Sequence, residues 1–312
     1  MKKILITGGS GFLGRSLAIK LKDKYEIVLG ARNNGLNKIA ESETGCKSIP
    51  LDVSSFDSVN DVLNQHRPEV IIHAAATKYV EISEEHPNEC IDVNILGSQN
   101  IARLAIDKGV ETVLGISTDK TAPPIGNIYG LSKAVMERMF TALNKKYETN
   151  FSCVRFGNIA WSTGSVFPIW KNMMEEQGII KSTGPRMRRF FFSVDEASDL
   201  VIRALGNINL CSGGILSKQM KSAQISDILD TWCELYDITW KEIDSRPGDK
   251  EDEYLIGELE IKNSRKIKLD DQVHFIINFN NRFETDLKEP LSSKNAERMT
   301  KKEIKELIKL GF

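Results

Sequence analysis

The sequence predicts an α/β fold, a doubly wound parallel Rossmann sheet followed by a smaller, discontinuous C-terminal lobe. Two observations lead to this class. Short apolar runs of strand length alternate with helical patterns through the first half of the chain. Such alternation builds a parallel sheet with helices on both faces. The first run, Ile4–Thr7, leads directly into a glycine-rich turn and the start of a periodic helix.

The elements of this first half can be placed in order. The uninterrupted Val-Ile-Ile of residues 70–72 is typical of a strand that is buried on both faces. Strands are predicted at Ile4–Thr7, Glu26–Gly30, Lys47–Leu51, Val70–His73, Thr112–Ile116 and Phe151–Phe156, with helices near Gly11–Lys22, Phe56–Gln65, Pro87–Lys108 and Tyr129–Lys146.

After about residue 160, prolines and glycines interrupt this rhythm. We expect Phe190–Val194 and a helix over Asp195–Leu205 to return to the sheet, and further helices at Ile225–Leu235 and Thr300–Leu310. The first domain is therefore predicted to span residues 1–165, rejoined by about 188–212. Residues 166–187 and 213–312 are predicted to form the second lobe.

The composition excludes several classes of protein. The chain has 312 residues, of which 41% are hydrophobic and 27% charged, and a formal net charge of −1. This charge provides no field that favours nucleic acid or an anionic membrane, and no apolar run is long enough to span a bilayer. The five cysteines are scattered and the four histidines lack ligand spacing, so we predict a cytoplasmic protein without a metal site.

The turn after the first strand has the pattern of a dinucleotide-binding loop. Its glycines fit both G-x-G-x-x-G and G-x-x-G-x-x-G. Glycines allow a sharp bend and a close approach to phosphate, while the helix start directs N–H groups toward the negative charge. A nicotinamide dinucleotide is therefore expected to lie against Gly8, Ser10, Gly11, Phe12, Leu13 and Gly14.

The end of the second strand indicates which dinucleotide binds. NAD-preferring Rossmann proteins carry an acidic residue there, but no Asp or Glu occurs between Val28 and Ala40. Arg32 could pair with a 2′-phosphate, so NADP is favoured over NAD; the alternative is a solvated loop arginine. Asp52 and Val53, after the third strand, are expected near the adenine, although Asp52 could instead be a helix cap before Ser54.

The chemistry is expected at the carboxyl edge of the sheet. Tyr129 and Lys133 are four residues apart and share a helix face, so the ammonium of Lys133 could lower the pKa of the Tyr129 phenol. Such a phenol can take a proton from an alcohol as hydride leaves carbon. Thr118, Asp119 and Lys120 follow the fifth strand and add a hydroxyl and an acid–base pair; the alternative is a surface ion pair.

These motifs resemble the extended short-chain dehydrogenase/reductase family, and within it the soluble, inverting UDP-N-acetylglucosamine 4,6-dehydratases of bacterial polysaccharide and nonulosonate biosynthesis. The specific segments are Ser117-Thr-Asp-Lys120 and Arg246-Pro-Gly248. The resemblance implies that Tyr129 deprotonates the C4 hydroxyl, held by Thr118, while hydride passes to NADP. Lys120 would then remove the C5 proton and Asp119 would protonate the departing C6 hydroxyl, before hydride returns to C6.

The resemblance also implies binding residues. Those assigned to the cofactor are Ala74, Ala75, Ala76, Lys78 and Asn94, besides Tyr129 and Lys133; those assigned to the sugar nucleotide are Lys78, Asn158, Val166, Pro168, Arg189, Arg246 and Glu253. The helices that begin at Pro87 and Tyr129 are expected to form the face of a homo-oligomer. The second lobe would bind substrate.

Two other functions remain open at this point. A nucleotide-sugar 4-epimerase would use Tyr129 and return hydride to C4, without any need for Asp119 and Lys120. A non-catalytic NADP sensor would need none of these side chains together.

Overall fold

The computed structural model describes residues 1–244, 250–285 and 287–312. At its centre is a nine-stranded sheet in the order β14-β15-β10-β6-β5-β4-β1-β2-β3. Neighbouring strands from β1 to β6 are all parallel and reverse their order between β1 and β4, where doubly wound folds bind ligands. These strands are β1 (Lys3–Thr7), β2 (Glu26–Ala31), β3 (Lys47–Pro50), β4 (Val70–His73), β5 (Thr112–Ile116) and β6 (Asn150–Arg155). The predicted fold class and strand positions are confirmed.

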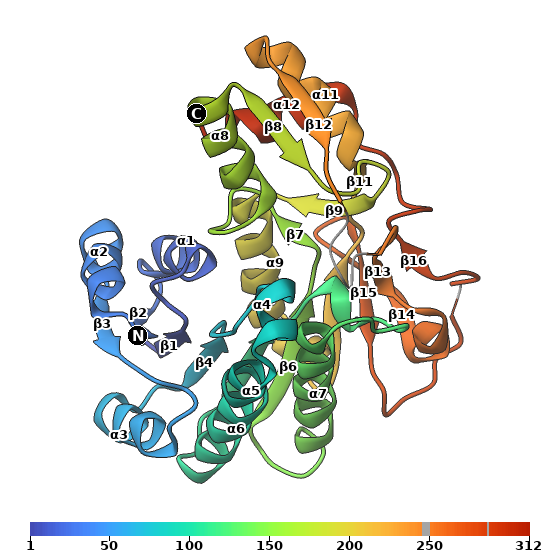
Figure 1. Cartoon of the computed structure of the whole chain (residues 1–312). Coiled ribbons are helices and arrows are strands. Elements are labelled where there is room, and N and C mark those ends of the chain that lie inside the picture. The colour runs from blue at the N-terminus through green and yellow to red at the C-terminus, as the bar shows by residue number, and fades with distance from the viewer. Residues whose placement is uncertain (245–249, 286) are drawn as a thin grey trace.

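Helices cover both faces of the sheet (Figure 1). α1 (Phe12–Leu21), α2 (Asn34–Thr44) and α9 (Val194–Gly206) bury apolar residues in one core, and α3 (Phe56–His66), α6 (Gly97–Asp107) and α7 (Ile128–Leu143) in the other. α2 was not predicted, although Asn33 caps its start and Gly45, in the left-handed region, ends it. The helix expected near Pro87–Lys108 consists of α5 (Pro87–Cys90), a π-helical segment (Ile91–Leu96) and α6.

The expected return of Phe190–Val194 to the large sheet is wrong. β9 (Arg188–Phe192) pairs instead with β7 (Asn158–Ile159) and β11 (Ser222–Gln224) in a separate three-stranded sheet. Phe190 and Phe192 enter the core beside α1, whereas Phe191 enters the core of the second lobe. The two faces of β9 therefore pack into two different cores. The strand that pairs with β6 in the large sheet is β10 (Ile215–Lys218).

The second lobe is organised around buried aromatic side chains. Phe167, Trp170 and Trp232 pack with apolar residues of α8 (Val166–Gln177), β8 (Ile179–Ser182), α11 (Ile225–Tyr236) and α12 (Lys301–Lys309). α11 and α12 confirm the two predicted helices. Figure 1 shows these elements, with β12 (Thr239–Glu242), grouped beyond one edge of the large sheet.

Other helices and strands complete the described part of the chain. They are α4 (Val80–Glu85), α10 (Ile208–Cys211), β13 (Tyr254–Ile256), β14 (Ser264–Leu269), β15 (Gln272–Ile277) and β16 (Leu291–Ser292). Because β10, β14 and β15 extend the large sheet, residues 213–312 contribute to the first domain as well as to the second lobe. Among the described residues, no helix has both the length and the apolar character to cross a membrane.

Candidate active site

The glycine turn is packed too closely for larger residues. Gly8 has a φ of +68°, and a Cβ there would lie 2.8 Å from the Ala75 nitrogen; a Cβ on Gly14 would lie 2.6 Å from the Gly9 oxygen. Gly11 begins α1 without a side-chain cap, and no acidic residue occupies the first turn of the helix. These features fit a pyrophosphate, since uncapped N–H groups and an exposed backbone can bind its oxygens.

The segment after β4 forms the expected wall of the cofactor site, with Ala74, Ala75 and Ala76 partly exposed. Asn94 is fully buried, and its side chain bonds the Thr77 backbone nitrogen at 2.8 Å, the Thr77 oxygen at 2.9 Å and Ser132 Oγ at 2.9 Å. Asn94 therefore holds this wall against α7, and its direct contact with a cofactor stays a prediction. The Lys78 ammonium lies 5.5 Å from the Tyr79 ring centre.

The ends of β2 and β3 carry the residues expected near the adenosine. Arg32 is about half exposed and lies 3.7 Å from the Glu89 carboxylate. Asp52 Oδ1 accepts hydrogen bonds from the Ser54 nitrogen at 3.0 Å and from Ser54 Oγ at 2.7 Å. Asp52 thus holds this turn, whereas the helix cap is Ser55. Val53 is buried where a Cβ on Gly97 would meet it.

Thr118, Asp119, Lys120 and Tyr129 lie together at the carboxyl end of β5. Thr118 Oγ1 donates to Asp119 Oδ1 at 3.0 Å, and Lys120 Nζ contacts the same oxygen at 3.0 Å. The Thr118 hydroxyl also acts to lower the pKa of the neighbouring Tyr129 phenol. Within the described chain, Asp119 Oδ2 is buried without a hydrogen-bond partner, and a Cβ on Gly157 would lie 3.1 Å from it. The structure thus brings together four of the five residues predicted to be catalytic.

Burial dominates the electrostatics of this group. It raises the pKa of Tyr129 to about 12, although the Lys120 ammonium and the Thr118 hydrogen bond act in the opposite direction. Burial also lowers the pKa of Lys133 to about 8. The contacts described for Lys133 Nζ comprise Met136 Sδ at 3.9 Å and no oxygen. Lys120 is therefore the cation that opposes the rise in the Tyr129 pKa, a role that was predicted for Lys133.

Most residues predicted to bind the sugar nucleotide lie in β7, α8, β9 and the segment before β13. Asn158 donates to the Phe190 oxygen at 3.2 Å, and Val166 and Pro168 lie in the first turn of α8. Arg189 is engaged by backbone, since its guanidinium donates to the Lys250 oxygen at 2.7 Å. Glu253 lies 3.7 Å from Lys120 Nζ. Arg246 falls outside the described residues.

The residues that anchor the Thr118–Lys120 segment to α7 were not predicted from the sequence. Glu137 Oε1 accepts hydrogen bonds from Ser117 Oγ at 2.6 Å and Thr121 Oγ1 at 3.1 Å, on either side of the Thr118–Lys120 segment. Arg155 pairs with both Glu137 and Glu260, and all three are buried. The available signal was spacing, because Glu137 follows Lys133 by four residues and shares its face of α7.

Comparison with known proteins agrees with this geometry. The profile of the polysaccharide biosynthesis protein family matches residues 4–274. The chain belongs to this family. Its members are extended short-chain dehydrogenase/reductase-like enzymes that modify nucleotide sugars.

Relatives carry different names. An uncharacterized membrane protein of Methanocaldococcus jannaschii is 34% identical over 99% of this chain and 95% of its own length. An inverting UDP-N-acetylglucosamine 4,6-dehydratase of Campylobacter jejuni is 31% identical over 82% and 78%. A UDP-glucose 4-epimerase of Rickettsia conorii is 29% identical over 98% and 95%. Some relatives are longer, and the chain spans only 36% of a probable polysaccharide biosynthesis protein of Bacillus subtilis.

Solved structures share the fold. Pen from Bacillus thuringiensis superposes with a TM-score of 0.87 at 27% identity, covering 99% of this chain and 97% of Pen. A Thermus thermophilus UDP-glucose 4-epimerase, solved as a complex with NAD, gives a TM-score of 0.72 at 20% identity over 80% and 88%.

Proposed function

We propose that this protein is an NADP-dependent nucleotide-sugar 4,6-dehydratase that acts on UDP-N-acetylglucosamine and inverts C5. The observation that carries the proposal is the junction of two groups at one sheet edge. Asp119 and Lys120 form an ion pair, and both the Lys120 ammonium and the Thr118 hydroxyl act to lower the pKa of the neighbouring Tyr129 phenol. An epimerase needs only Tyr129 and Thr118, whereas elimination of water also needs a base at C5 and an acid at C6.

We assign the roles as the family resemblance implies. When bound, a nicotinamide dinucleotide supplies a hydride acceptor at C4 and later a hydride donor to C6. Tyr129 takes the proton of the C4 hydroxyl, and Thr118 orients that oxygen. Transfer of the ion-pair proton from Lys120 to Asp119 leaves a neutral amine and a carboxylic acid. The amine then takes the C5 proton, acidified by the 4-keto group, while Asp119 gives its proton to the C6 hydroxyl, which departs as water. After hydride reaches C6, the resulting enolate takes a solvent-derived proton at C5, on the opposite face when C5 is inverted. Lys133, deeply buried and without an oxygen partner in the described chain, is available for ribose hydroxyls.

The decisive experiment is incubation with UDP-N-acetylglucosamine in deuterated water, followed by mass spectrometry and NMR. Dehydration predicts deuterium at C5 and the loss of water, which is 18 mass units in ordinary water and one fewer when C5 carries deuterium. Unchanged mass with altered C4 configuration would establish the epimerase, a function that the name of the Rickettsia relative supports. If the protein binds the cofactor but turns over neither this nor any other nucleotide sugar, the result would favour the non-catalytic NADP sensor.

The proposed preference for NADP depends on Arg32. This side chain is half exposed, and the first turn of α2 holds no acid. The Glu89 carboxylate lies 3.7 Å from the Arg32 guanidinium, and a 2′-phosphate would take its place. Arg32→Ala should weaken NADP binding by about tenfold, as expected for one exposed charge-assisted contact, and leave NAD binding unchanged. Titration of both cofactors, with the exposed Arg103→Ala on α6 as the control, measures this difference. Equal loss for NAD and NADP would contradict the assignment.

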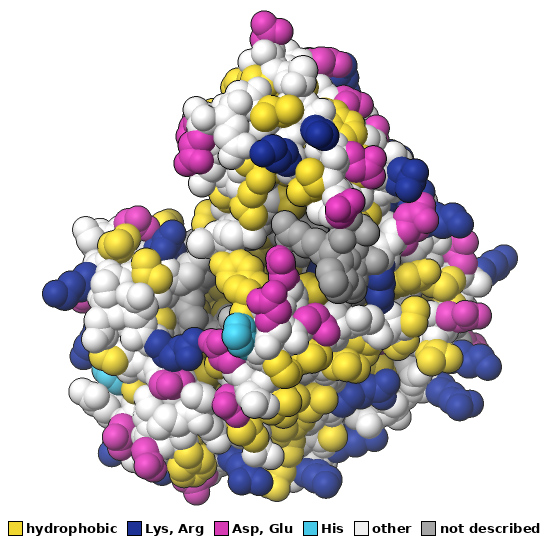
Figure 2. All heavy atoms as spheres, in the orientation of Figure 1, with side chains coloured by type: hydrophobic (Ala, Val, Ile, Leu, Met, Phe, Trp, Pro, Cys, Tyr) yellow, Lys and Arg dark blue, Asp and Glu magenta, His cyan; other side chains and the backbone are white. Residues whose placement is uncertain are grey.

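A homo-oligomer is proposed on the surface around α6 and α7. Ile91, Leu96, Leu131 and Val135 are between 40 and 51% exposed, and Figure 2 shows hydrophobic side chains gathered over this part of the molecule. Such a patch favours a symmetric interface. Leu131→Glu with Val135→Glu should convert the oligomer to a monomer in light scattering, whereas a wild-type monomer would contradict the proposal.

A further inference from the structure

Lys120 lies close to two carboxylates, one from the neighbouring residue and one from a segment that is distant in the sequence. Its Nζ is 3.0 Å from Asp119 Oδ1, on the same segment, and 3.7 Å from Glu253 Oε1. The Glu253 side chain is 7% exposed and belongs to the segment that leads into β13. The second lobe thus delivers a buried negative charge to the acid–base group of the sheet edge.

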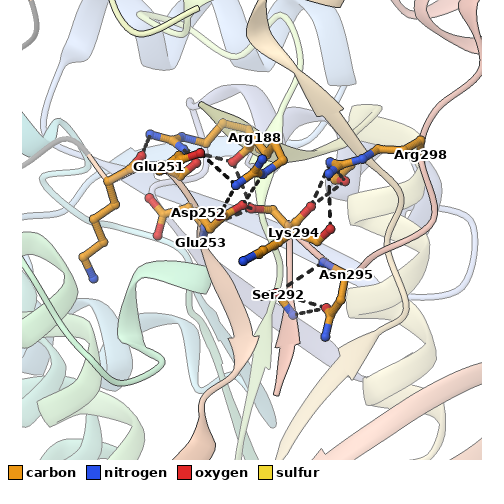
Figure 3. Close-up of polar contacts among 12 residues, drawn as sticks. Arg188, Glu251, Asp252, Glu253, Ser292, Lys294, Asn295 and Arg298 are labelled. Atoms are coloured by element: carbon orange, nitrogen blue, oxygen red, sulfur yellow. Dashed lines mark hydrogen bonds and ion pairs between the residues drawn. The ribbon is translucent and has the colours of Figure 1, made fainter. Parts of the chain in front are cut away.

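A network of hydrogen bonds fixes the segment that carries Glu253. Arg188 pairs with the Asp252 carboxylate through Nε at 2.7 Å and Nη2 at 2.5 Å (Figure 3). The Glu253 nitrogen donates to Ser293 Oγ at 3.0 Å, and the Ser293 nitrogen donates to the Glu253 oxygen at 2.8 Å. The carboxylate of Glu253 is therefore held beside Lys120 by a fixed backbone rather than by a free loop.

Four charged or titratable groups act on the Lys120 ammonium. Burial lowers the pKa of Lys120, but Asp119 and Glu253 together raise it above its usual value, and Arg189 opposes them. The phenol of Tyr129 is coupled to Lys120 as well. Removal of either carboxylate should therefore make the amine lose its proton at lower pH.

We propose that Glu253 is a positioning residue for the proton-transfer step, which holds the Lys120 ammonium at the sheet edge and sets the pH at which it gives up its proton. This role deepens the proposed dehydration and depends on it for the identity of the step. The titration of Lys120 itself does not depend on the substrate.

The first test measures Lys120 directly. Competitive acetylation with acetic anhydride at a series of pH values, read by peptide mass spectrometry, reports the fraction of each lysine present as free amine. Glu253→Gln should shift the acetylation profile of Lys120 to lower pH by about one to three units, from the Coulomb energy of a pair at this distance in an effective dielectric constant of about 20. Glu258→Gln, an exposed residue nearby, is the matched control. An unshifted profile in Glu253→Gln overturns the proposal.

The second test uses the reaction. The limb of the pH–rate profile for dehydration that depends on Lys120 should move to lower pH in Glu253→Gln but not in Glu258→Gln. Wild-type protein that fails to dehydrate would refute the proposed function and leave the acetylation result standing. A dehydrating wild type with an identical profile in Glu253→Gln would refute the positioning role alone.

A second variant covers the outcome that Glu253→Gln does not fold, as judged by thermal unfolding. Asp252→Asn weakens the Arg188 pair and loosens the segment while it keeps the Glu253 carboxylate. It should shift the acetylation profile in the same direction by a smaller amount. No shift in this folded variant would count against control of Lys120 by the second lobe.

Discussion

Two groups of buried charged side chains lie along α7, and they differ in how completely their polar atoms are paired. Around Arg155, the guanidinium bonds Glu137, Glu260 and the Leu255 oxygen at distances between 2.6 and 2.9 Å. At the sheet edge, the contact described for Lys133 Nζ is the Met136 sulfur. Asp119 Oδ2 has no hydrogen-bond partner in the described chain.

The difference separates a structural role from a chemical one. Buried polar groups are normally paired, because an unpaired one costs free energy. Complete pairing around Arg155 makes that group a support for α7, β6 and the segment after β13. Incomplete pairing of Lys133 and Asp119 supports the proposal that these groups find their partners in a ligand. Glu137 joins the two groups, since it contacts Arg155 and both ends of the catalytic segment.

The largest effect is expected at the sheet edge. Tyr129→Phe removes the phenol that moves the C4 proton, so turnover should fall by about 10²–10⁴-fold, the usual contribution of a general acid–base group. Cofactor binding, measured by fluorescence titration, should remain. Substantial turnover in this variant would contradict the assigned role and would end the comparison.

Arg155→Met should damage the paired group instead. It leaves the Glu137 and Glu260 carboxylates buried without their cation, which should lower the free energy of unfolding by about 3–5 kcal/mol. Urea denaturation measures the loss. The triple variant with Glu137→Gln and Glu260→Gln should recover part of it, because no uncompensated charge remains. A single variant as stable as wild type would show that the pairing carries no stability.

Lys133→Met should do the reverse and stabilise the fold while it removes activity. Burial lowers the pKa of Lys133 from 10.5 to about 8, so the folded state binds this proton less tightly than the unfolded state. The stability of the wild type should therefore rise as pH increases from about 8 to 10.5. At pH 7 the variant should be more stable by about 1–3 kcal/mol. Denaturation at pH 7 and pH 10 should show that gain shrinking; a constant gain would contradict the lowered pKa.

The smallest effect is expected where the two groups meet. Thr121→Val removes one of the donors to Glu137 Oε1 and should cost about 1–2 kcal/mol of stability. It should also lower kcat more than it raises KM, since Thr118 and Lys120 lose one of their anchors. Thr285→Val, at a partly exposed site whose hydroxyl accepts a local backbone hydrogen bond, is the control. Equal effects from both variants would deny Glu137 its linking role.

Much of the fold was open to prediction because its signals are local. The order of strands and helices, the glycine turn and the grouping of Thr118, Asp119, Lys120 and Tyr129 all depend on residues close together in the chain. The failures were not local. β9 has the apolar run of a sheet strand, but its alternate faces serve two different cores. The partner of the Tyr129 phenol was also misassigned, because spacing along a helix does not show where a long side chain ends.

The sequence alone therefore determined the class of fold, the nucleotide-binding turn and the residues that gather where β5 ends, since periodicity and spacing act over a few residues. Only the tertiary structure decided that Glu253 meets Lys120 and that Arg155 meets Glu260. These contacts join segments more than a hundred residues apart. Which distant charges meet depends on the order of strands in the sheet and on the packing of the second lobe against it.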